Sequence, residues 1–356
     1  MFRQNGFFRT FGTELLRAIT AFCVALILIA GFSGRANSAQ PAPFFAGKTI
    51  YILIGFGPGG ANDVWGRTIA KHLGNHIPGQ PRVIVQNEPG AGGLKLMNQL
   101  YNLSPKDGTV IGLINRGLPF EPLLGGEGVQ FDPLKMNWIG SPDRDTTVCA
   151  ARKDARVKNM RDLFGKELLA GATGSGADTA LYPEFLSQLL GMKFRTIKGY
   201  QGTRDISLAM ERGEVEGLCL AYDSLLREPL AREGRINILF QAALTPDPRL
   251  TQIPVATDLA RSDADRQALV LFFARVELGR PLVLPPGVPA DRVALLREAL
   301  HQTVDDPAFR ADASRQQLNL NYIEGEQLRE TIAAAFRTPQ AVVQRTKAAL
   351  GRAARP

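Results

Sequence analysis

The stretch that decides the fold is Tyr51-Ile-Leu-Ile-Gly-Phe-Gly-Pro-Gly-Gly-Ala-Asn-Asp-Val-Trp-Gly-Arg67. An apolar run suited to a buried strand ends in a turn rich in glycine and proline, and a helical pattern follows the turn. Such a turn directs free backbone N–H groups toward whatever lies beyond the strand, which is the outline of an anion site. A similar strand, glycine loop and helix recur over residues 168–190.

Around these two units, strand patterns alternate with helix patterns. This alternation predicts an α/β protein with mostly parallel sheets, and two lobes facing a shared cleft account for the repeated unit. We expect strands at residues 49–54, 82–86, 109–114, 138–139, 146–151, 168–172, 194–197, 215–222 and 236–242. We expect helices at residues 64–76, 94–103, 160–163, 180–190, 205–212, 290–304, 326–336 and 339–350, with a proline-rich loop after residue 242.

The N-terminal residues have the layout of a secretory signal. A basic start with Arg3, Arg9 and Arg17 precedes an apolar run from Ala18 to Ala30, which is shorter than the ~20 residues that span a bilayer. Small residues follow the run, so we expect residues 1–39 to be cleaved and the mature protein to be periplasmic. A retained N-terminal anchor is the alternative.

Charge excludes one class of partner. Removal of residues 1–39 lowers the count of basic residues from 42 to 38 and that of acidic residues from 34 to 33. The basic residues of the mature chain are scattered, with no cluster that alternates with aromatic residues. We therefore expect no nucleic-acid binding and a mild attraction for anionic solutes.

The first glycine loop does not fit a nucleotide site. A phosphate-binding loop needs Lys and Ser or Thr after its last glycine, whereas Ala61-Asn62-Asp63 stands here and the Asp63 carboxylate repels phosphate. A dinucleotide pattern can be placed on Gly55, Gly57 and Gly60, but that pattern is weak alone. A tight turn without a ligand is the alternative.

Catalytic and metal sites find little support. His72 and His76 share a helix face, but Leu73 replaces the glutamate of the metalloprotease motif. Ser175 lies between glycines without the outer glycines of a hydrolase elbow. We expect no enzyme activity, no metal and no cofactor.

The two cysteines of the mature chain, Cys149 and Cys219, leave two alternatives open. In an oxidising compartment they can form a disulfide, and otherwise they are two small buried side chains on separate strands.

Several motifs together resemble one family. They are Pro58-Gly-Gly60 with Asp63 and Arg67, Gln86-Asn-Glu-Pro-Gly-Ala-Gly-Gly93, Pro105-Lys-Asp-Gly-Thr109, Gly199-Tyr-Gln-Gly202, Gly279-Arg-Pro281 and Pro285-Pro-Gly-Val-Pro-Ala-Asp-Arg292. In this order they resemble the extracytoplasmic solute receptors of tripartite tricarboxylate transporters, the Bug or TctC-like family. The likeness covers roughly residues 48–340.

The resemblance implies a two-lobed architecture of the type II periplasmic-binding kind, closing on a small carboxylate. We expect lobe 1 at residues 40–145 and 238–356 and lobe 2 at residues 146–237. In such receptors backbone N–H groups, hydroxyls and waters hold the carboxylate. The matching positions are Phe56, Gly57, Gly59, Gly60, Asp63, Asn87, Ala91, Thr173, Gly174, Ser175, Tyr200, Gln201, Tyr222 and Asp223.

Asp178 departs from the family pattern and has two interpretations. In the first turn of a helix its carboxylate is stabilised by the helix dipole, which needs no ligand. If the carboxylate instead faces the cleft, it competes with anionic ligand groups and favours a ligand with fewer carboxylates or with a basic group.

The resemblance predicts an exported, monomeric receptor that captures a small carboxylate by hinge closure and delivers it to integral membrane transporter subunits through transient contact. A ligand sensor that partners a membrane signalling kinase is the alternative, and an exported enzyme on the same scaffold is a third. Which carboxylate is bound does not follow from these residues.

Overall fold

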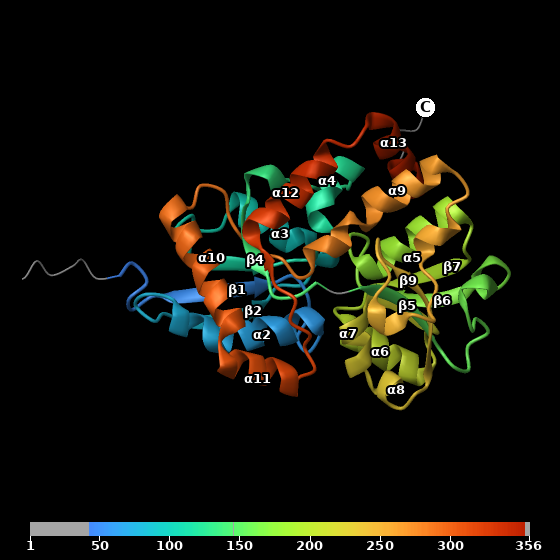
Figure 1. Ribbon diagram of the computed structural model, residues 1–356, viewed down its shortest axis with the longest axis horizontal. Coiled ribbons are helices and arrows are strands. Elements are labelled where there is room, and N and C mark those ends of the chain that lie inside the picture. The colour runs from blue at the N-terminus through green and yellow to red at the C-terminus, as the bar shows by residue number, and fades with distance from the viewer. Residues whose placement is uncertain (1–42, 145, 353–356) are drawn as a thin grey trace, which may run out of the picture. The chain divides into compact units, whose positions relative to one another are not determined.

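The computed structural model of the protein describes residues 43–144 and 146–352 (Figure 1). The expected signal segment, residues 1–39, lies outside the described residues. From Phe44 onward the described residues form one compact unit. No helix of the described ranges is long and apolar enough to cross a membrane.

The first lobe contains a sheet with the strand order β11-β4-β10-β3-β1-β2. Its strands are β1 (Thr49–Ile54), β2 (Arg82–Asn87), β3 (Val110–Leu113), β4 (Asn137–Ser141), β10 (Leu282–Leu284) and β11 (Ile323–Glu324). The helices of this lobe are α2 (Ala61–Leu73), α3 (Leu94–Asn102), α4 (Glu121–Leu124), α10 (Ala290–Asp305), α11 (Pro307–Arg315) and α12 (Gly325–Phe336).

Strand β1 shows why this sheet is covered on both faces. Its side chains alternate between the two faces. Ile50, Ile52 and Ile54 enter one core with residues of α2 and α10, while Leu53 enters the other core with residues of α3 and α12. A strand buried on both faces reads as a continuous apolar run, as residues 50–54 do.

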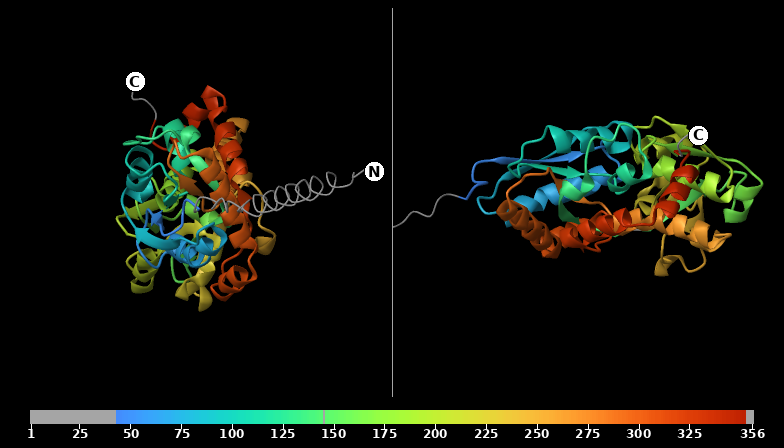
Figure 2. Two further views of the ribbon diagram at one scale, coloured as in Figure 1. Left: turned by 90° about the vertical axis from the view of Figure 1, so that its left-hand side faces the viewer. Right: turned by 90° about the horizontal axis from the view of Figure 1, so that it is seen from above.

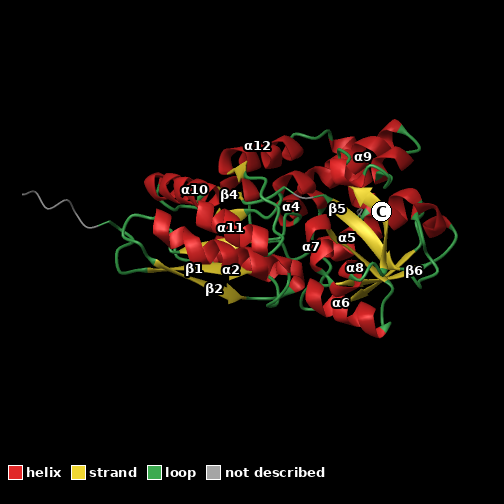
Figure 3. Ribbon diagram, turned by 60° about the horizontal axis from the view of Figure 1, so that its bottom comes forward, coloured by secondary structure: helices red, strands yellow, loops and turns green. Residues whose placement is uncertain are grey.

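The second lobe contains a sheet with the order β7-β6-β8-β5-β9. Strands are yellow in Figure 3, where β5 and β6 of this sheet are labelled. Its strands are β5 (Thr147–Arg152), β6 (Leu168–Ala172), β7 (Phe194–Lys198), β8 (Gly217–Ala221) and β9 (Ile236–Ala242). Its helices are α5 (Asp178–Leu190), α6 (Thr203–Arg212), α7 (Tyr222–Arg227), α8 (Pro229–Arg232) and α9 (Asp263–Phe273), against which α13 (Gln340–Ala349) packs. Short 3-10 helices lie at Gly74–His76, Ala91–Gly93, Leu118–Phe120, Pro133–Lys135, Met160–Phe164, Pro248–Leu250, Ala256–Leu259 and Ala274–Leu278.

Aromatic side chains join α5 to α9 in the second lobe. The Phe185 and Phe272 rings stack with centroids 3.9 Å apart, and Tyr182 stacks on Phe273 at 5.6 Å. The C-terminal chain, red in Figure 2, runs from α12 on the first lobe to α13 beside α9 and α5. The chain thus returns to the second lobe after completing the first.

The prediction of mostly parallel sheets is wrong, because both sheets are mixed. Among the described strands four pairings are parallel and five are antiparallel. Strands joined by a crossover helix within one lobe run parallel, as β1 and β2 do. Strands that enter a sheet from the other lobe, such as β5 and β10, run antiparallel to neighbours.

Several element predictions also need correction. Helices α9 and α11 occupy stretches for which we predicted no helix, and Tyr222 begins α7 instead of ending a strand. The expected limit of lobe 2 at residue 237 falls inside β9, which pairs with β5 as far as Ala242. Phe272 and Phe273 of α9 belong to the core of the second lobe as well.

The chain passes between the sheets at two adjacent places, after β4 and before β10. The Ser141 hydroxyl donates to the Asp143 carbonyl at 2.7 Å and accepts from the Arg280 N–H at 2.8 Å. Gly279 lies between them with φ +57°, and a Cβ there would stand 1.7 Å from the Asp143 carbonyl oxygen. Only glycine fits so close a crossing.

Candidate functional site

A cavity opens where the two lobes meet, with about 700 Å³ of empty space including its opening. Residues from both lobes and from the second crossing line it. They are Phe56, Gly60, Ala61, Asn62, Ile114, Asn115, Arg116, Thr173, Ala177, Asp178, Thr179, Gly202, Thr203, Cys219, Leu220, Ala221, Ser224, Gly279 and Arg280.

Three helices begin at this cavity. Gly60 caps α2, Ala177 caps α5 and Gly202 caps α6, and all three residues line the cavity. The first backbone N–H groups of a helix have no partner within the helix, and the helix dipole adds positive potential there. The cavity therefore receives anion-stabilising ends from α2 of one lobe and from α5 and α6 of the other.

Asp63 shapes the loop before α2 and does not line the cavity. Its carboxylate accepts from the Gly59 N–H at 2.8 Å, from Arg67 Nε at 2.9 Å and from Asn87 Nδ2 at 2.9 Å. Burial pushes the pKa of Asp63 upward, but these hydrogen bonds outweigh it and hold the pKa below its usual value. The Asp63 carboxylate, which we expected to repel phosphate, is therefore paired with donors from its own loop and the neighbouring strand end.

Asn87 has the same supporting role. Its Nδ2 also donates to the Phe56 carbonyl at 3.0 Å, and its Oδ1 accepts from Arg67 at 3.1 Å. Asn87, Asp63 and Arg67 therefore tie the end of β2 to the loop that presents Phe56 and Gly60.

Arg116 lies in the loop after β3, which ends at Leu113, and its side chain contacts the second lobe. Its Nε lies 2.9 Å from Asp178 Oδ2 at the start of α5, and its Nη2 donates to the Thr147 hydroxyl of β5. The side chain is almost wholly buried. Arg116 thus joins the two lobes by an ion pair beside the cavity.

Asp178 is consequently both a first-turn residue and a cavity residue. Besides Arg116, it faces the buried Arg275, whose Nη1 lies 3.6 Å from Asp178 Oδ1. Arg275 donates from Nε to the Phe272 carbonyl at 2.9 Å and stacks on the Phe272 ring. Two guanidinium groups therefore balance the charge of Asp178.

Arg280 is the second cavity arginine. It forms an ion pair with the fully buried Asp143 and donates to the Ser224 hydroxyl at 2.9 Å. Burial, together with the nearby positive charge of Arg116, lowers the pKa of Arg280 to about 9. The guanidinium is still protonated at neutral pH.

Of the predicted site residues, Phe56, Gly60 and Thr173 line the cavity. Other predicted residues lie at contacts between the two lobes beside the cavity. The Gly57 N–H donates to the Gln201 carbonyl at 3.0 Å. A Cβ on Gly174 would lie 2.6 Å from the Gly92 nitrogen, next to Ala91. A Cβ on Gly59 would lie 3.2 Å from the Arg204 Cδ.

The remaining predicted residues do not line the cavity. Ser175 is exposed and accepts from Lys198 Nζ at 3.4 Å. Tyr200 packs on a core of the second lobe. The Arg249 guanidinium lies over the Tyr222 ring and donates a hydrogen bond to Asp223 Oδ1 at 2.5 Å.

The arginines were missed by sequence reasoning, although a signal existed for Arg116. Asn115-Arg116 follows a strand with four buried residues, and ligands of open α/β sheets lie at the carboxyl ends of strands. Arg280 belongs to the Gly279-Arg-Pro281 segment of the family resemblance, but its place at the cavity was not predicted, because β10, the strand after it, was not predicted.

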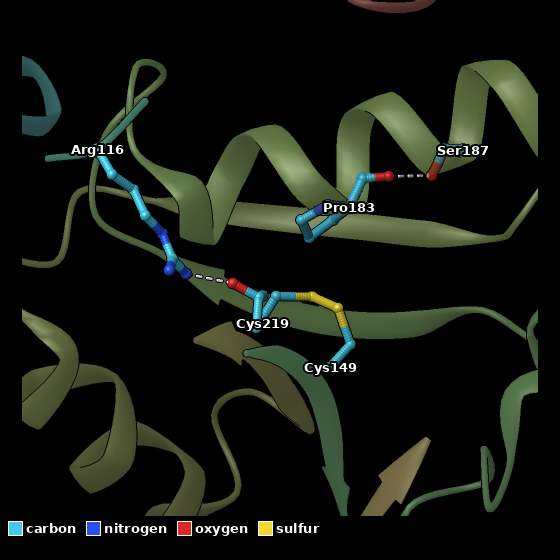
Figure 4. The surroundings of a disulfide bond; sticks show 6 residues. Arg116, Cys149, Pro183, Ser187 and Cys219 are labelled. Atoms are coloured by element: carbon cyan, nitrogen blue, oxygen red, sulfur yellow. Dashed lines mark hydrogen bonds between the residues drawn. A yellow bond between two sulfur atoms is a disulfide. The ribbon is translucent and has the colours of Figure 1, made fainter. Parts of the chain in front are cut away.

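A disulfide joins Cys149 of β5 to Cys219 of β8, whose strands are antiparallel neighbours with these two residues in register. This settles the alternatives in favour of pairing. Cys219 also lines the cavity, and the Arg116 side chain extends toward it (Figure 4). In the described ranges no group of three His, Cys, Asp or Glu side chains is placed to hold a metal ion.

The chain is similar to known proteins over most of its length. The family model described as tripartite tricarboxylate transporter family receptor matches residues 66–348. The UPF0065 protein in gbd 5'region of Cupriavidus necator is 23% identical over 338 residues, covering 93% of this chain and 96% of that protein. A second UPF0065 protein, from Bordetella pertussis, is 27% identical over 307 residues, covering 83% of this chain and 86% of its own.

Solved structures share the fold. The periplasmic binding protein BugD has a TM-score of 0.64 at 20% identity, covering 84% of this chain and 96% of its own. MatC from Rhodopseudomonas palustris, solved with malate, has a TM-score of 0.66 at 17% identity, covering 86% of this chain and 100% of its own. The family resemblance seen in the motifs is confirmed, and this chain belongs to the TctC family of tripartite tricarboxylate transporter receptors.

Proposed function

We propose that this protein is a periplasmic solute-binding receptor that captures a small organic carboxylate in the cavity between its lobes. One observation carries the proposal: the N-termini of α2, α5 and α6 and the guanidinium groups of Arg116 and Arg280 meet at a single cavity. Backbone N–H groups and guanidinium groups are the donors that offset the lost hydration of a carboxylate.

The fold neighbours support an acid as ligand. MatC was solved with malate, and a second Rhodopseudomonas palustris protein, with a TM-score of 0.66, was solved with adipate. No general acid or base is needed for such a task, so the receptor works by binding alone.

Lobe closure supplies the mechanism. Three hydrogen bonds join the lobes: Gly57 to Gln201, Arg116 to Asp178, and Arg280 to Ser224. The first two start from the first lobe and the third from the crossing segment before β10. A ligand that contacts both lobes binds the closed arrangement more tightly and shifts the population toward it. Ser141, Gly279 and Arg280 at the adjacent crossings are where the hinge would lie.

Export and delivery complete the proposal. The buried disulfide between Cys149 and Cys219 suits an oxidising compartment such as the periplasm. The monomeric receptor would then pass its ligand to integral membrane transporter subunits. Purification of those subunits with the closed receptor from membranes tests this step, since the empty receptor should be retained less.

A thermal-shift screen tests the binding function itself. The mature protein is unfolded, dialysed and refolded to remove any carried ligand, and then heated with mono-, di- and tricarboxylates and amino acids. A ligand at a hundred times its Kd stabilises the folded state by about 2.7 kcal/mol, which raises the melting temperature measurably. If every carboxylate leaves the melting temperature unchanged, the proposal is wrong.

A further inference from the structure

The last helix, α13, packs on both lobes, where it contacts α4, α5 and α9 (Figure 1). Val343 on α13 is buried in a core with residues of α3 and α12 of the first lobe. Ala349 is buried in a core with residues of α5 and α9 of the second lobe. Leu350, directly after the helix, packs against both cores. A rotation of one lobe against the other therefore has to move this helix against at least one core.

Ion pairs fix α13 to each lobe. Arg345 on α13 donates from Nε to Asp265 Oδ1 of α9, in the second lobe, at 3.1 Å. Arg352, just after the helix, places its Nη1 2.8 Å from Glu121 Oε2 of α4, in the first lobe. The chain enters α13 from α12, which also packs on the first lobe. The helix is thus tied to the first lobe at both ends and to the second lobe between them.

The ion pair between Glu121 and Arg352 leaves little room for movement. The Glu121 side chain is 4% exposed and that of Arg352 is 17% exposed. A Cβ on Gly126, in the turn after α4, would collide with Glu121 Oε2, so the carboxylate is closely fitted where it meets Arg352. Separation of the two charges would leave a buried carboxylate without this partner, which is strongly unfavourable.

We propose that α13 and Arg352 form a clasp that stabilises the arrangement in which the two lobes touch. When the lobes part, α13 stays on the second lobe through Arg345 and Ala349, and the contact that breaks is the one between Glu121 and Arg352. The clasp goes beyond the proposed function, because its residues do not line the cavity and it acts whether or not a ligand is bound.

Two backbone hydrogen bonds distinguish parting of the lobes from unfolding. The Gly57 N–H donates to the Gln201 carbonyl of the other lobe at 3.0 Å. The Leu168 N–H donates to the Lys193 carbonyl within the second lobe at 2.9 Å. Exchange of the Gly57 amide hydrogen with solvent therefore requires the lobes to part, whereas exchange at Leu168 requires the second lobe itself to open.

The test is hydrogen exchange of the ligand-free mature protein, followed by NMR at these two amides. The variant Glu121→Gln/Arg352→Gln removes both charges, so that neither remains buried alone. We expect its Gly57 amide to exchange about fivefold faster or more, the lower end of typical coupling between sites, with Leu168 unchanged. The matched control is Glu233→Gln/Arg235→Gln, which removes an exposed pair within the second lobe and should change neither amide.

Gly126→Ala disturbs the same contact by a second route, because its Cβ displaces the Glu121 carboxylate without removing a charge. It should also accelerate exchange at Gly57, and it decides the matter if the double variant does not fold. An unchanged Gly57 rate in a folded variant overturns the clasp. Equal acceleration at Gly57 and Leu168 also overturns it, because that result reports a general loss of stability. Since no ligand is present, failure of every carboxylate to bind would contradict the proposed function alone.

Discussion

At the residue scale, the charged side chains near the cavity divide into supports and ligand-facing groups. Asp63 resembles a ligand residue in the sequence, yet three protein donors occupy its carboxylate. Arg280 lies outside the glycine-loop motifs, yet it faces the cavity with only Asp143 and Ser224 as side-chain hydrogen-bond or ion-pair partners in the described ranges. Residue type and motif position did not distinguish these roles, because the distinction depends on which partners the fold brings within reach.

The supporting role of Asp63 predicts a pH-dependent loss of stability in Asp63→Asn. Because the folded-state pKa is lowered, the stabilisation by this carboxylate is present above the unfolded pKa of about 3.9 and is lost as pH falls through the folded pKa. We expect the variant to be less stable by about 1–3 kcal/mol at neutral pH. Urea unfolding should show this difference shrinking below pH of about 4. Asp291→Asn, an exposed first-turn acid of α10, is the control and should show no such trend.

At the element scale, most strands and helices were predictable, whereas helices α9 and α11 and strand β10 were not. Strands β1, β2, β6 and β9 and helices α5, α10 and α12 lie within a few residues of their predicted ranges. The missed helices α9 and α11 did have capping signals: Ser262 and Asp306 accept from backbone N–H groups of their first turns. Strand β10 has three residues, which is too few for a recognisable pattern. Because this strand was not predicted, the position of Arg280 beside it was not predicted either.

The disulfide between β5 and β8 closes a long loop, with a sequence separation of 70. A cross-link over that separation restricts the unfolded chain and typically stabilises a protein by about 2–5 kcal/mol. Replacing both Cys149 and Cys219 by alanine should lower the free energy of unfolding by this amount. The measurement is urea unfolding without reductant. Equal stability of the variant and the unaltered protein would show that the pair contributes nothing.

The crossing at Gly279 tolerates no side chain. Gly279→Ala would place a Cβ 1.7 Å from the Asp143 carbonyl oxygen at a φ of +57°. Gly191, which ends α5 with φ +80° and has no atom within 4 Å of such a Cβ, is the matched control. Gly191→Ala should cost about 1–2 kcal/mol from backbone conformation alone. Gly279→Ala should cost clearly more in the same unfolding assay, and an equal loss in both variants would contradict the close crossing.

At the scale of the whole molecule, the two-lobed α/β fold was predictable because the strand, glycine loop and helix occur twice. The mixed sheets were not, because strand direction depends on how often the chain passes between the lobes. Phe56, Gly60 and Thr173, which the family resemblance implied as site residues, line the cavity. The arginine pairs that span the lobes depend on the position of one lobe against the other, which no local pattern encodes.

Because the two lobes touch at Gly57 and Gln201, we expect that a disulfide between these two positions can hold the lobes closed. A Cβ on Gly57 would lie 3.2 Å from the Gln201 Cβ, close to the distance that a disulfide requires. Oxidised Gly57→Cys/Gln201→Cys protein should bind and release ligand much more slowly than the same protein under mild reduction. Gly57→Cys alone serves as the control. Unchanged association and dissociation rates in the oxidised double variant would show that the lobes need not open.

The most direct test of a carboxylate site at this cavity is a calorimetric titration of Arg280→Gln/Asp143→Asn. Removing Arg280 alone would leave Asp143 buried and unpaired, which costs about 3–5 kcal/mol, and the second substitution relieves that penalty. With the carboxylate that stabilises the unaltered protein most, we predict one-to-one binding to the unaltered protein and at least tenfold weaker binding to the folded double variant. Equal affinity in the two proteins would contradict the account.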